Sequence, residues 1–505
     1  MAANLELSEI QHFYKNSTFL LTGTTGFVGK LILEKILRTL HPQRIYVLIR
    51  DKDGKSAEER CAEMFDSLAF EPLKRSDANF FKKVTLIRGD LQEPDLGLSV
   101  ADKQLIINEV RCFFHCAAAS KLSESLKNAT SVNVRGTIAL LDIAKEIKNI
   151  KTFVYLSSIY SNFPKFEVHE VFYEPAIAAE DLLKSLENVN EDGAKSMQQQ
   201  LQGDWPNAYT FTLSVVEDYI KRKSKGLPVT IVRPSLLLPS ESEPITGFVD
   251  NINGLYGDTV TYALGVNKVN YYNSGILDVI PADYVVNLSI ASGWYAGLQK
   301  LRLQRGDVST VDANIYHCIT SQEKPITTDD WFEVIHTVTR EVPSVKMIQL
   351  PIQFNTSSYY VYKFLTFFLH VCMAFLCDLG LKLAGKKQSI MSMYDKIHQT
   401  QELFSPYLLK QWYFSNDNTQ KLLKRLSFKD RSLFNFDIFN LNWEAYFDSY
   451  SKGIRVYLLK DPMSTLTEGK EKQKKKLISQ ILSASILTII LYVISKFILF
   501  RVLLK

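Results

Sequence analysis

Thr22-Gly23-Thr24-Thr25-Gly26-Phe27-Val28-Gly29 joins a short apolar run, residues 17–22, to a segment with helical periodicity, residues 29–37. Glycines with the spacing G-x-x-G-x-x-G let the backbone turn tightly and approach a pyrophosphate at the N-terminus of the helix. The stretch therefore predicts a dinucleotide-binding turn between the first strand and the first helix. A Walker-type ATP site is disfavoured, because no hydroxyl follows Lys30 to bind magnesium.

Strand-like runs recur along the first half of the chain, at residues 44–50, 84–88, 111–115, 151–157 and 229–234. Helical stretches separate these runs, and such alternation is typical of an α/β protein with a doubly wound, parallel, Rossmann-type sheet. The glycine spacing is that of extended short-chain dehydrogenases. Near residue 352 the composition changes, so we predict a reductase domain with substrate-binding insertions at 1–351 and a smaller, mostly helical domain at 352–460.

The bulk composition indicates a globular protein larger than one ordinary domain, with 46% hydrophobic and 22% charged residues in 505. A net charge of +5 and the lack of any zinc-finger or RNA-binding signature argue against nucleic acid as a partner. His115-Cys116 suggests a metal site only weakly, because it ends a strand-like run. We expect no metal.

The C-terminal region predicts contact with a lipid bilayer. A basic linker, 461–476, carries five lysines within 470–476, and the apolar stretch 477–504 contains only Lys496 and Arg501 as charges. We interpret 477–504 as a membrane-anchoring helix, either a span or a shallow hairpin, with its basic flank in the cytosol. A second uncharged stretch, 364–377, is too short to span comfortably and fits an interfacial helix, a lipid-pocket wall or a core helix.

The residues after the predicted strands favour NADPH as the cofactor. Arg50 directly follows the second strand, where arginine binds the 2′-phosphate of NADP and an acidic residue such as Asp51 would bind the ribose of NAD. Asp90 and Leu91 follow the third strand, where they are expected beside the adenine. Small residues after the fourth strand let a cofactor lie against the backbone, namely Ala117 and Ala118.

Hydroxyl groups suited to carbonyl reduction follow the fifth strand and open a later helix. Ser158 lies in Ser157-Ser158-Ile159-Tyr160, and Tyr209 lies in Trp205-Pro-Asn-Ala-Tyr-Thr-Phe-Thr212. In short-chain reductases a serine hydroxyl polarises the carbonyl, and a tyrosine hydroxyl donates a proton as the hydride arrives. A lysine four residues after the tyrosine would lower its pKa and hold the cofactor ribose.

These motifs together resemble the alcohol-forming fatty acyl-CoA reductases over nearly the whole chain. The matching stretches are 22–29, Gly89-Asp90-Leu91, 115–118, 155–162, 205–212, Ile231-Val-Arg-Pro-Ser235, Glu243-Pro-Ile-Thr-Gly-Phe-Val-Asp-Asn251, Ile280-Pro-Ala-Asp283 and the end of the helical domain near 453–457.

The resemblance implies NADPH-dependent, two-step reduction of a long-chain fatty acyl-CoA to a primary alcohol and CoA through a bound aldehyde. It implies Ser158 and Tyr209 as catalytic residues and adds Pro234 and Ser235 to the cofactor site. It also implies a protein of lipid metabolism on the endoplasmic reticulum or peroxisome membrane, with its catalytic domain in the cytosol.

One position departs from the family pattern, because Leu213 stands where the lysine of Y-x-x-x-K belongs. An apolar side chain there cannot assist proton transfer from Tyr209. The sequence therefore leaves an alternative, a catalytically impaired relative that binds acyl-CoA and NADPH. A dehydrogenase for a sterol or nucleotide sugar is disfavoured by the acyl-reductase motifs.

Overall fold

A seven-stranded, wholly parallel sheet forms the centre of the protein. The computed structural model describes residues 7–386 and 389–503, and beyond residue 482 it describes the side chains of Ser485 and Tyr492 only. The strands lie in the order β11-β7-β5-β4-β1-β2-β3. Their bounds are β1 Thr18–Thr22, β2 Arg44–Ile49, β3 Val84–Arg88, β4 Cys112–His115, β5 Thr152–Leu156, β7 Val229–Pro234 and β11 Asn314–Cys318. The doubly wound parallel sheet predicted from the sequence is confirmed.

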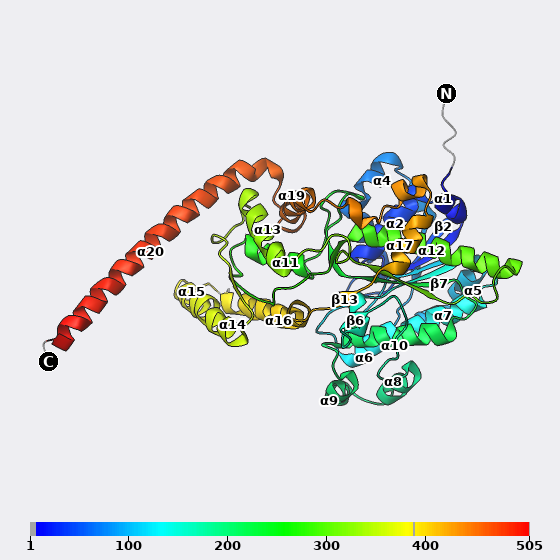
Figure 1. Cartoon of the computed structure of the whole chain (residues 1–505), viewed down its shortest axis with the longest axis horizontal. Helices are drawn as coiled ribbons and strands as arrows, with labels where there is room; N and C mark the ends of the chain where they lie inside the picture. Colours follow the sequence, from blue (N-terminus) through cyan, green and yellow to red (C-terminus); the bar gives the residue numbers. More distant parts are fainter. Residues whose placement is uncertain (1–6, 387–388, 504–505) are drawn as a thin grey trace, which may run out of the picture.

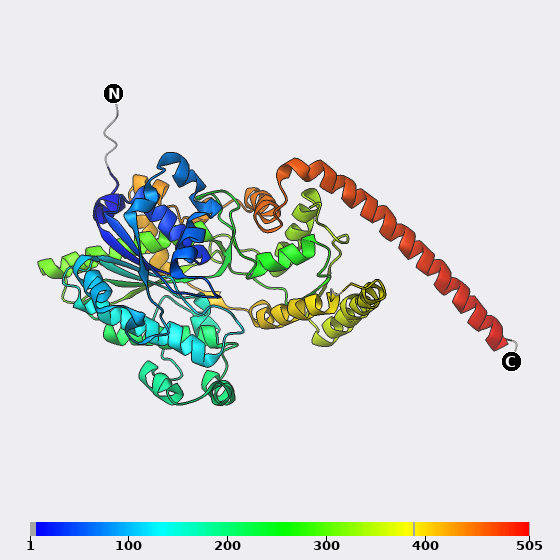
Figure 2. The same ribbon diagram turned by 180° about the vertical axis from the view of Figure 1, so that it is seen from behind.

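Helices cover both faces of the sheet and make a three-layer domain (Figures 1 and 2). One face is covered by α1 Glu9–Tyr14, α2 Phe27–Thr39 and α12 Ala282–Arg305. The other is covered by α5 Val100–Glu109, α7 Gly136–Glu146 and α10 Ala208–Lys223. Peripheral helices are α3 Ala57–Phe65, α4 Glu71–Ser76, α6 Leu126–Ala129, α8 Ala179–Leu186 and α9 Glu191–Gln202. All strands except the edge strand β3 are almost wholly buried, which explains their continuous apolar runs.

All six strands predicted from apolar runs are present, and a seventh, β11, was missed. β11 is a short edge strand paired with β7, in register Ile315 with Ile231. It comes after a long helix and carries Asn314 and His317 among its five residues. Nothing in this local pattern distinguishes it from a loop, because its strand identity depends on β7 beside it.

A second lobe combines segments from both parts of the chain. It contains α11 Leu255–Ala263 and α13 Thr328–Glu341 together with α14 Tyr359–Thr366, α15 Met373–Leu383, α16 Ile390–Leu409 and α19 Trp443–Gly453. Conversely, the chain returns to the first lobe through β13 Tyr413–Phe414, which pairs with β6 Glu167–Val168, and through α17 Asp417–Arg425, which packs on β11. α18 Phe428–Leu433 follows it. The two lobes are therefore interleaved.

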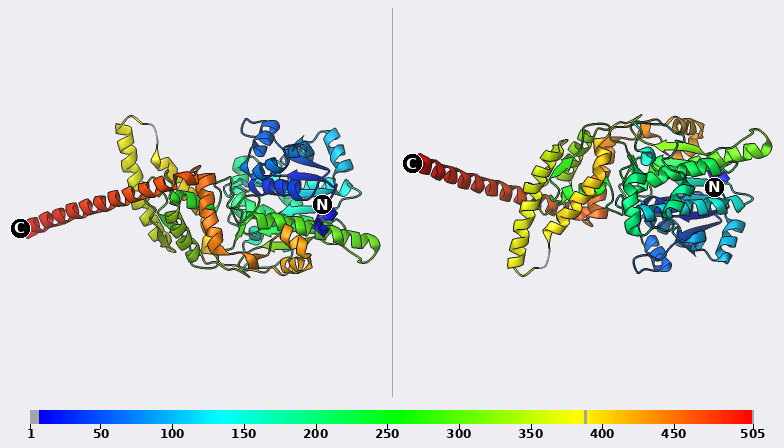
Figure 3. Two further views of the ribbon diagram at one scale, coloured as in Figure 1. Left: turned by 90° about the horizontal axis from the view of Figure 1, so that it is seen from above. Right: turned by 90° about the horizontal axis from the view of Figure 1, so that it is seen from below.

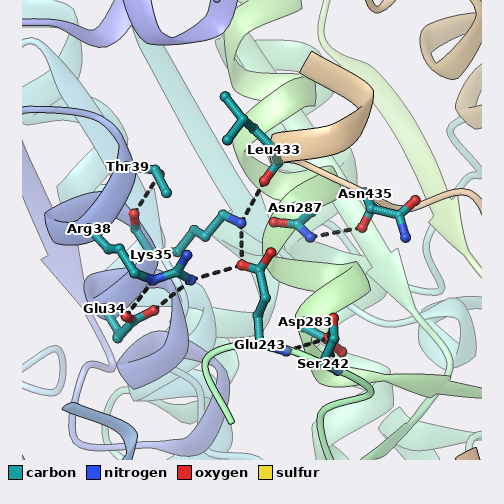
Figure 4. A network of polar contacts seen from close by, with 10 residues as sticks. All are labelled: Glu34, Lys35, Arg38, Thr39, Ser242, Glu243, Asp283, Asn287, Leu433 and Asn435. Atoms are coloured by element: carbon teal, nitrogen blue, oxygen red, sulfur yellow. Dashed lines mark hydrogen bonds and ion pairs between the residues drawn. The ribbon is translucent and has the colours of Figure 1, made fainter. Parts of the chain in front are cut away.

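The stretch Glu243–Asn251, one of the motifs noted in the sequence, is held against α2 by a partly buried ionic network (Figure 4). Lys35 donates to Glu243 and to the carbonyl of Leu433 (2.6 Å), while Arg38 bridges Glu243 (2.8 Å) and Glu34 (2.7 Å). Asp283 accepts the backbone N–H of Glu243 at 3.0 Å. Glu243 and Asp283 therefore hold the 243–251 stretch in place between α2 and α12.

A single long helix ends the described chain. α20, Leu466–Leu503, includes most of the predicted basic linker 461–476 and nearly all of the predicted anchor 477–504. It projects from the end of the molecule opposite the sheet (Figure 1). Residues 504–505 lie outside the described residues. Among the described residues, one helix, Tyr359–Leu383, is long and apolar enough to cross a membrane by length and composition. The predicted apolar stretch 364–377 is the middle of that longer helix.

Candidate active site

The glycine turn is closed tightly against the neighbouring strand. Gly23 has a φ of +76°, and a Cβ there would lie 2.6 Å from the backbone nitrogen of Ala117. A Cβ on Gly29 would lie 2.3 Å from the carbonyl oxygen of Gly23, and Gly26 is the N-cap of α2. Only glycine fits at positions 23 and 29. The backbone of the turn can therefore approach an anionic ligand at the helix N-terminus.

A buried hydrogen-bond chain fixes the end of β4 beside this turn. Thr22 Oγ1 accepts the N–H of Ala117 (3.2 Å) and lies 2.7 Å from Nδ1 of His115, whose Nε2 lies 2.9 Å from Thr137 Oγ1. Burial lowers the pKa of His115 to about 3, so the imidazole is neutral. His115 is structural here. Among the described residues there is no group of three or more His, Cys, Asp or Glu side chains that could hold a metal ion.

The remaining residues predicted for the cofactor site lie at the start of α2, after β3 and β4, and at the end of β7. Phe27 and Val28 are buried in the first turn of α2, and Leu91 is buried beneath Gly136. Ala117 and Ala118 are half-buried after β4, Pro234 ends β7, and Ser235 follows it. The hydroxyls of Thr24 and Ser235 are buried and have no hydrogen-bond partner among the described residues. Thr24 belongs to the glycine turn, and Ser235 follows β7 further along the same sheet. Unpartnered buried hydroxyls after strands of a parallel sheet fit a polar cofactor that would supply their partners.

Two arginines flank the turn where the adenosine end of a dinucleotide would lie. Arg50 pairs with Asp90 at 3.0 Å. Arg60, on α3, donates to Thr25 Oγ1 of the glycine turn (3.0 Å) and to the carbonyl of Arg50 (2.5 Å). Asp51 accepts the N–H of Ala57 at 2.7 Å and so caps α3. Sequence reasoning missed Arg60, because only the fold brings α3 over the turn.

Two adjacent serines at the end of β5 have different environments. Ser157 donates to Glu217 at 2.5 Å. Ser158 is the N-cap of the short helix η5, Ile159–Asn162, and its Oγ accepts the N–H of Tyr160 at 3.2 Å. That bond leaves the Ser158 O–H free to donate to a ligand. The structure therefore favours Ser158 over Ser157 as the hydroxyl that would meet a carbonyl.

Tyr209 lies in the first turn of α10, which packs against η5. Its ring is half-buried and its hydroxyl bonds to no described residue. Burial, with Tyr407 nearby, raises the pKa of Tyr209, so the phenol is protonated at neutral pH. Asn207, the N-cap of α10, donates to Tyr407 Oη at 2.7 Å. Tyr407 belongs to α16. It is 200 residues from Asn207 in the chain, so the sequence could not place the two side by side.

The lysine position is fully buried in apolar surroundings. Leu213 is 0% exposed and belongs to the core cluster between α10 and the sheet. One turn on, Glu217 is bound to Arg233, whose guanidinium is itself fully buried and saturated with acceptors. Lys121 is exposed, and Lys221 lies over the ring of Phe172 at 6.0 Å. No described lysine replaces the missing ammonium beside Tyr209.

Comparison with solved structures agrees with the fold. The terminal R domain from the myxalamid PKS-NRPS biosynthetic pathway superposes with a TM-score of 0.57 at 19% identity, over 89% of this chain and 93% of that domain. The reductase domain of a nonribosomal peptide synthetase from Mycobacterium tuberculosis gives a TM-score of 0.54 at 16% identity, over 91% of this chain and 96% of that one.

Sequence comparison is more specific. Two family models, both described as "Male sterility protein", match residues 21–289 and 369–461, and the first is an NAD-binding model. Fatty acyl-CoA reductase 1 of Xenopus laevis is 32% identical over 92% of this chain and 89% of its own length, and that of Homo sapiens is 31% identical over the same shares. Fatty acyl-CoA reductase 2 of Homo sapiens is 30% identical over 93% of this chain and 90% of its own length. With its parallel sheet, its glycine cradle and relatives matched over nearly the whole chain, this protein belongs to the fatty acyl-CoA reductase family.

Proposed function

We propose that the protein reduces a long-chain fatty acyl-CoA to the primary fatty alcohol and CoA, with NADPH as reductant and the aldehyde held between two steps. The observation that carries the proposal is the placement of Ser158 and Tyr209 on packed elements, η5 and α10, of a chain with a glycine cradle and reductase relatives. Each step consumes one NADPH and one proton, and the first step releases CoA as the thiol.

The chain's residues act on the carbonyl oxygen in both steps. Bound NADPH supplies hydride to the carbonyl carbon. Ser158 donates a hydrogen bond from Oγ to the carbonyl oxygen and stabilises the negative charge that develops there. In the aldehyde step, Tyr209 donates its phenolic proton to that oxygen. Asn207 and Tyr407 position the first turn of α10, and the apolar walls around Leu213 exclude water behind Tyr209.

A second candidate function rests on Leu213. With no ammonium near Tyr209, burial keeps the phenol's pKa high and makes it a weak acid. A chain of this kind binds NADPH and acyl-CoA but turns over slowly. The fold, the cradle and Ser158 are the same in both functions, so only the rate separates them.

Purified full-length protein with NADPH and palmitoyl-CoA is expected to yield hexadecanol and free CoA. Alcohol is quantified by gas chromatography and cofactor use by absorbance. Tyr209→Phe should lower alcohol formation on the order of 10²-fold or more, because it removes the proton donor. NADPH binding, followed by fluorescence, should persist in this variant. A folded wild type that binds both NADPH and palmitoyl-CoA and forms little or no alcohol would contradict the proposed function and favour the second candidate.

Arg50 and Arg60, which flank the glycine turn, favour NADPH over NADH as the cofactor. Arg60→Ala should weaken NADPH binding by about 10- to 100-fold, since one charge-assisted hydrogen bond contributes roughly 1.5–3 kcal/mol. NADH lacks the 2′-phosphate, so its affinity should change little. Fluorescence titration with both cofactors measures this without turnover.

Arg88→Ala is the matched control, because Arg88 is an exposed arginine that pairs with Glu58 on the same α3 helix. Equal losses for NADPH and NADH in Arg60→Ala would show a purely structural role for Arg60 and contradict this assignment.

We also propose that the protein is membrane-anchored with its catalytic part in the cytosol, on the endoplasmic reticulum or peroxisome. The lysines of 470–476, which precede the apolar stretch of α20, support this orientation.

A further inference from the structure

The apolar helix Tyr359–Leu383 is exposed along one side. It comprises α14, the π-helical turn η6 Phe367–Cys372, and α15, and only 17% of its apolar window is buried. Its exposed apolar side chains include Tyr360, Phe364, Phe367, Phe368, Phe375, Leu376, Leu379 and Leu383. So many large apolar groups on one helix mark a surface that is covered by another apolar phase.

The opposite side of this helix is packed on the protein. Tyr362, Thr366, His370 and Ala374, spaced four residues apart, are each at most 4% exposed. The helix therefore has two faces, one against the second lobe and one apolar and bare. A helix that crossed a bilayer alone would expose its whole circumference to lipid.

Polar bonds join the buried face to α16. Tyr362 donates to Gln401 at 3.0 Å, His370 Nδ1 lies 2.9 Å from His398 Nε2, and Lys363 forms an ion pair with Glu402. α16 is amphipathic and charged, so it cannot enter the hydrocarbon core at acceptable cost. Because these bonds hold the two helices together, the apolar helix cannot cross the bilayer in this fold.

A cavity of about 220 Å³ lies between α16 and α11, and two residues of its wall contact Tyr362 of the apolar helix. Tyr271 and Gln401 line this cavity, and both contact Tyr362, whose ring stacks on Tyr271 at 5.2 Å between centroids. Phe404 and Leu408 of α16 line it further along. The same helix carries Tyr407 to the N-cap of α10 beside Tyr209. α16 thus runs from the cavity to the candidate active site.

The apolar helix and the last helix lie at the same end of the molecule. Figure 3 shows α14–α16 (yellow) at the end from which α20 (red) projects. Exposed apolar side chains begin α20's apolar stretch at Leu477 and Ile478. Lys382 and Lys386 are exposed at the end of the apolar helix, and the lysines of 470–476 precede the stretch in α20. Cations flanking apolar surface complement an anionic lipid surface.

We propose that helix Tyr359–Leu383 lies in the plane of one membrane leaflet, with its phenylalanine face in the lipid and its other face on α16. The cavity between α16 and α11 takes a long acyl chain from that leaflet. The chemical class of this occupant rests on the proposed function; the lipid contact does not.

Lipid contact is tested by photo-cross-linking of the full-length protein in vesicles of phosphatidylcholine and phosphatidylserine. A benzophenone amino acid replaces Phe364 or Phe375 on the apolar face, and Phe428, which is 91% exposed on α18, is the matched control. The vesicles carry a phospholipid with an alkyne-tagged acyl chain. Cross-linking at the first two positions should exceed that at Phe428 by about tenfold or more. Equal labelling at all three positions overturns the proposal.

The orientation is tested by labelling cysteines at the two ends of the helix. Ser357→Cys and Lys386→Cys are both at exposed positions. In sealed vesicles whose outside-facing active domain has been verified by protease access, an impermeant maleimide should label both. Labelling of only one end until detergent is added would show a span and overturn the in-plane arrangement.

The cavity is tested with the same photoreactive residue at Thr400, an exposed position on the cavity wall. It should cross-link alkyne-tagged palmitoyl-CoA, and untagged palmitoyl-CoA should compete whereas CoA alone should not. No cross-link, or competition by CoA alone, excludes an acyl chain from the cavity. None of these readouts requires turnover, so an inactive protein that contacts lipid refutes the proposed function and leaves this inference standing.

Discussion

Leu213→Lys is expected to raise kcat for alcohol formation by about 10²- to 10⁴-fold, the range that a positioned proton-transfer partner contributes. The new ammonium would lie one turn from Tyr209 on the same face of α10. A cation there favours the phenolate, lowers the tyrosine pKa and makes the phenol a stronger acid. Turnover is measured as hexadecanol formed from palmitoyl-CoA and NADPH.

The environment of residue 213 sets what else this substitution does. Leu213 is fully buried among apolar side chains, so an ammonium there is costly until a bound cofactor ribose supplies acceptors. We therefore expect lower thermal stability without NADPH and recovery of part of it with NADPH. Leu213→Met, of similar size and without charge, should change neither the rate nor the response to cofactor.

Adding Tyr209→Phe to Leu213→Lys should remove the gained activity, because the lysine acts through the phenol. An unchanged rate in an already active protein would refute the impaired-relative alternative and show that the chain reduces its substrate by other means. A folded Leu213→Lys protein without activity would contradict the assignment of Tyr209 as proton donor.

Glu217→Ala is expected to destabilise the fold by about 3–5 kcal/mol, the usual result of removing one partner of a buried ion pair. Arg233 is 0% exposed and donates to Glu217 at 2.5 Å. Its other donors bind the carbonyls of His169 (3.1 Å) and Val171 (3.1 Å) and Nε2 of His317 (3.2 Å). Ser157 would also lose its acceptor, so the loop that carries Ser158 should loosen.

Chemical denaturation followed by circular dichroism measures this loss, with two comparisons. Glu217→Gln keeps an acceptor oxygen for Ser157 and should cost less than Glu217→Ala. Glu180→Ala breaks an exposed pair with Arg222 and should cost only about 0–1 kcal/mol. If Glu217→Ala and Glu180→Ala lowered the free energy of unfolding equally, the buried pair would not hold α10, β7 and the loop after β5 together.

Two charged residues of the motifs shared with the family bind other parts of the protein. Asp283 binds the backbone of the loop that follows β8, Leu236–Leu238, and Glu243 binds Lys35 and Arg38 of α2. Charged residues in a family motif can therefore mark the joint between lobes. Their chemistry alone did not distinguish this role from a contact with ligand.

Much of the fold could be predicted because its signals are local. The glycine spacing of residues 22–29 requires a tight turn whatever lies around it, and the apolar runs of six strands have no other stable place than a covered parallel sheet. Ser158 and Tyr209 were placed as candidates because each follows or begins such an element. The departure at Leu213 was likewise visible from a four-residue spacing on one helix.

The remainder depends on contacts between residues far apart in the chain. β11 is a strand only because β7 pairs with it, and Arg60 reaches the glycine turn only because α3 folds over it. Tyr407 comes to the N-cap of α10 across 200 residues. The sequence by itself determined the sheet, the nucleotide turn and the missing lysine, since period and glycine geometry are properties of neighbouring residues. Only the tertiary structure decided which groups surround Tyr209 and which face of helix Tyr359–Leu383 is bare, because burial and ion pairing are properties of the packed chain.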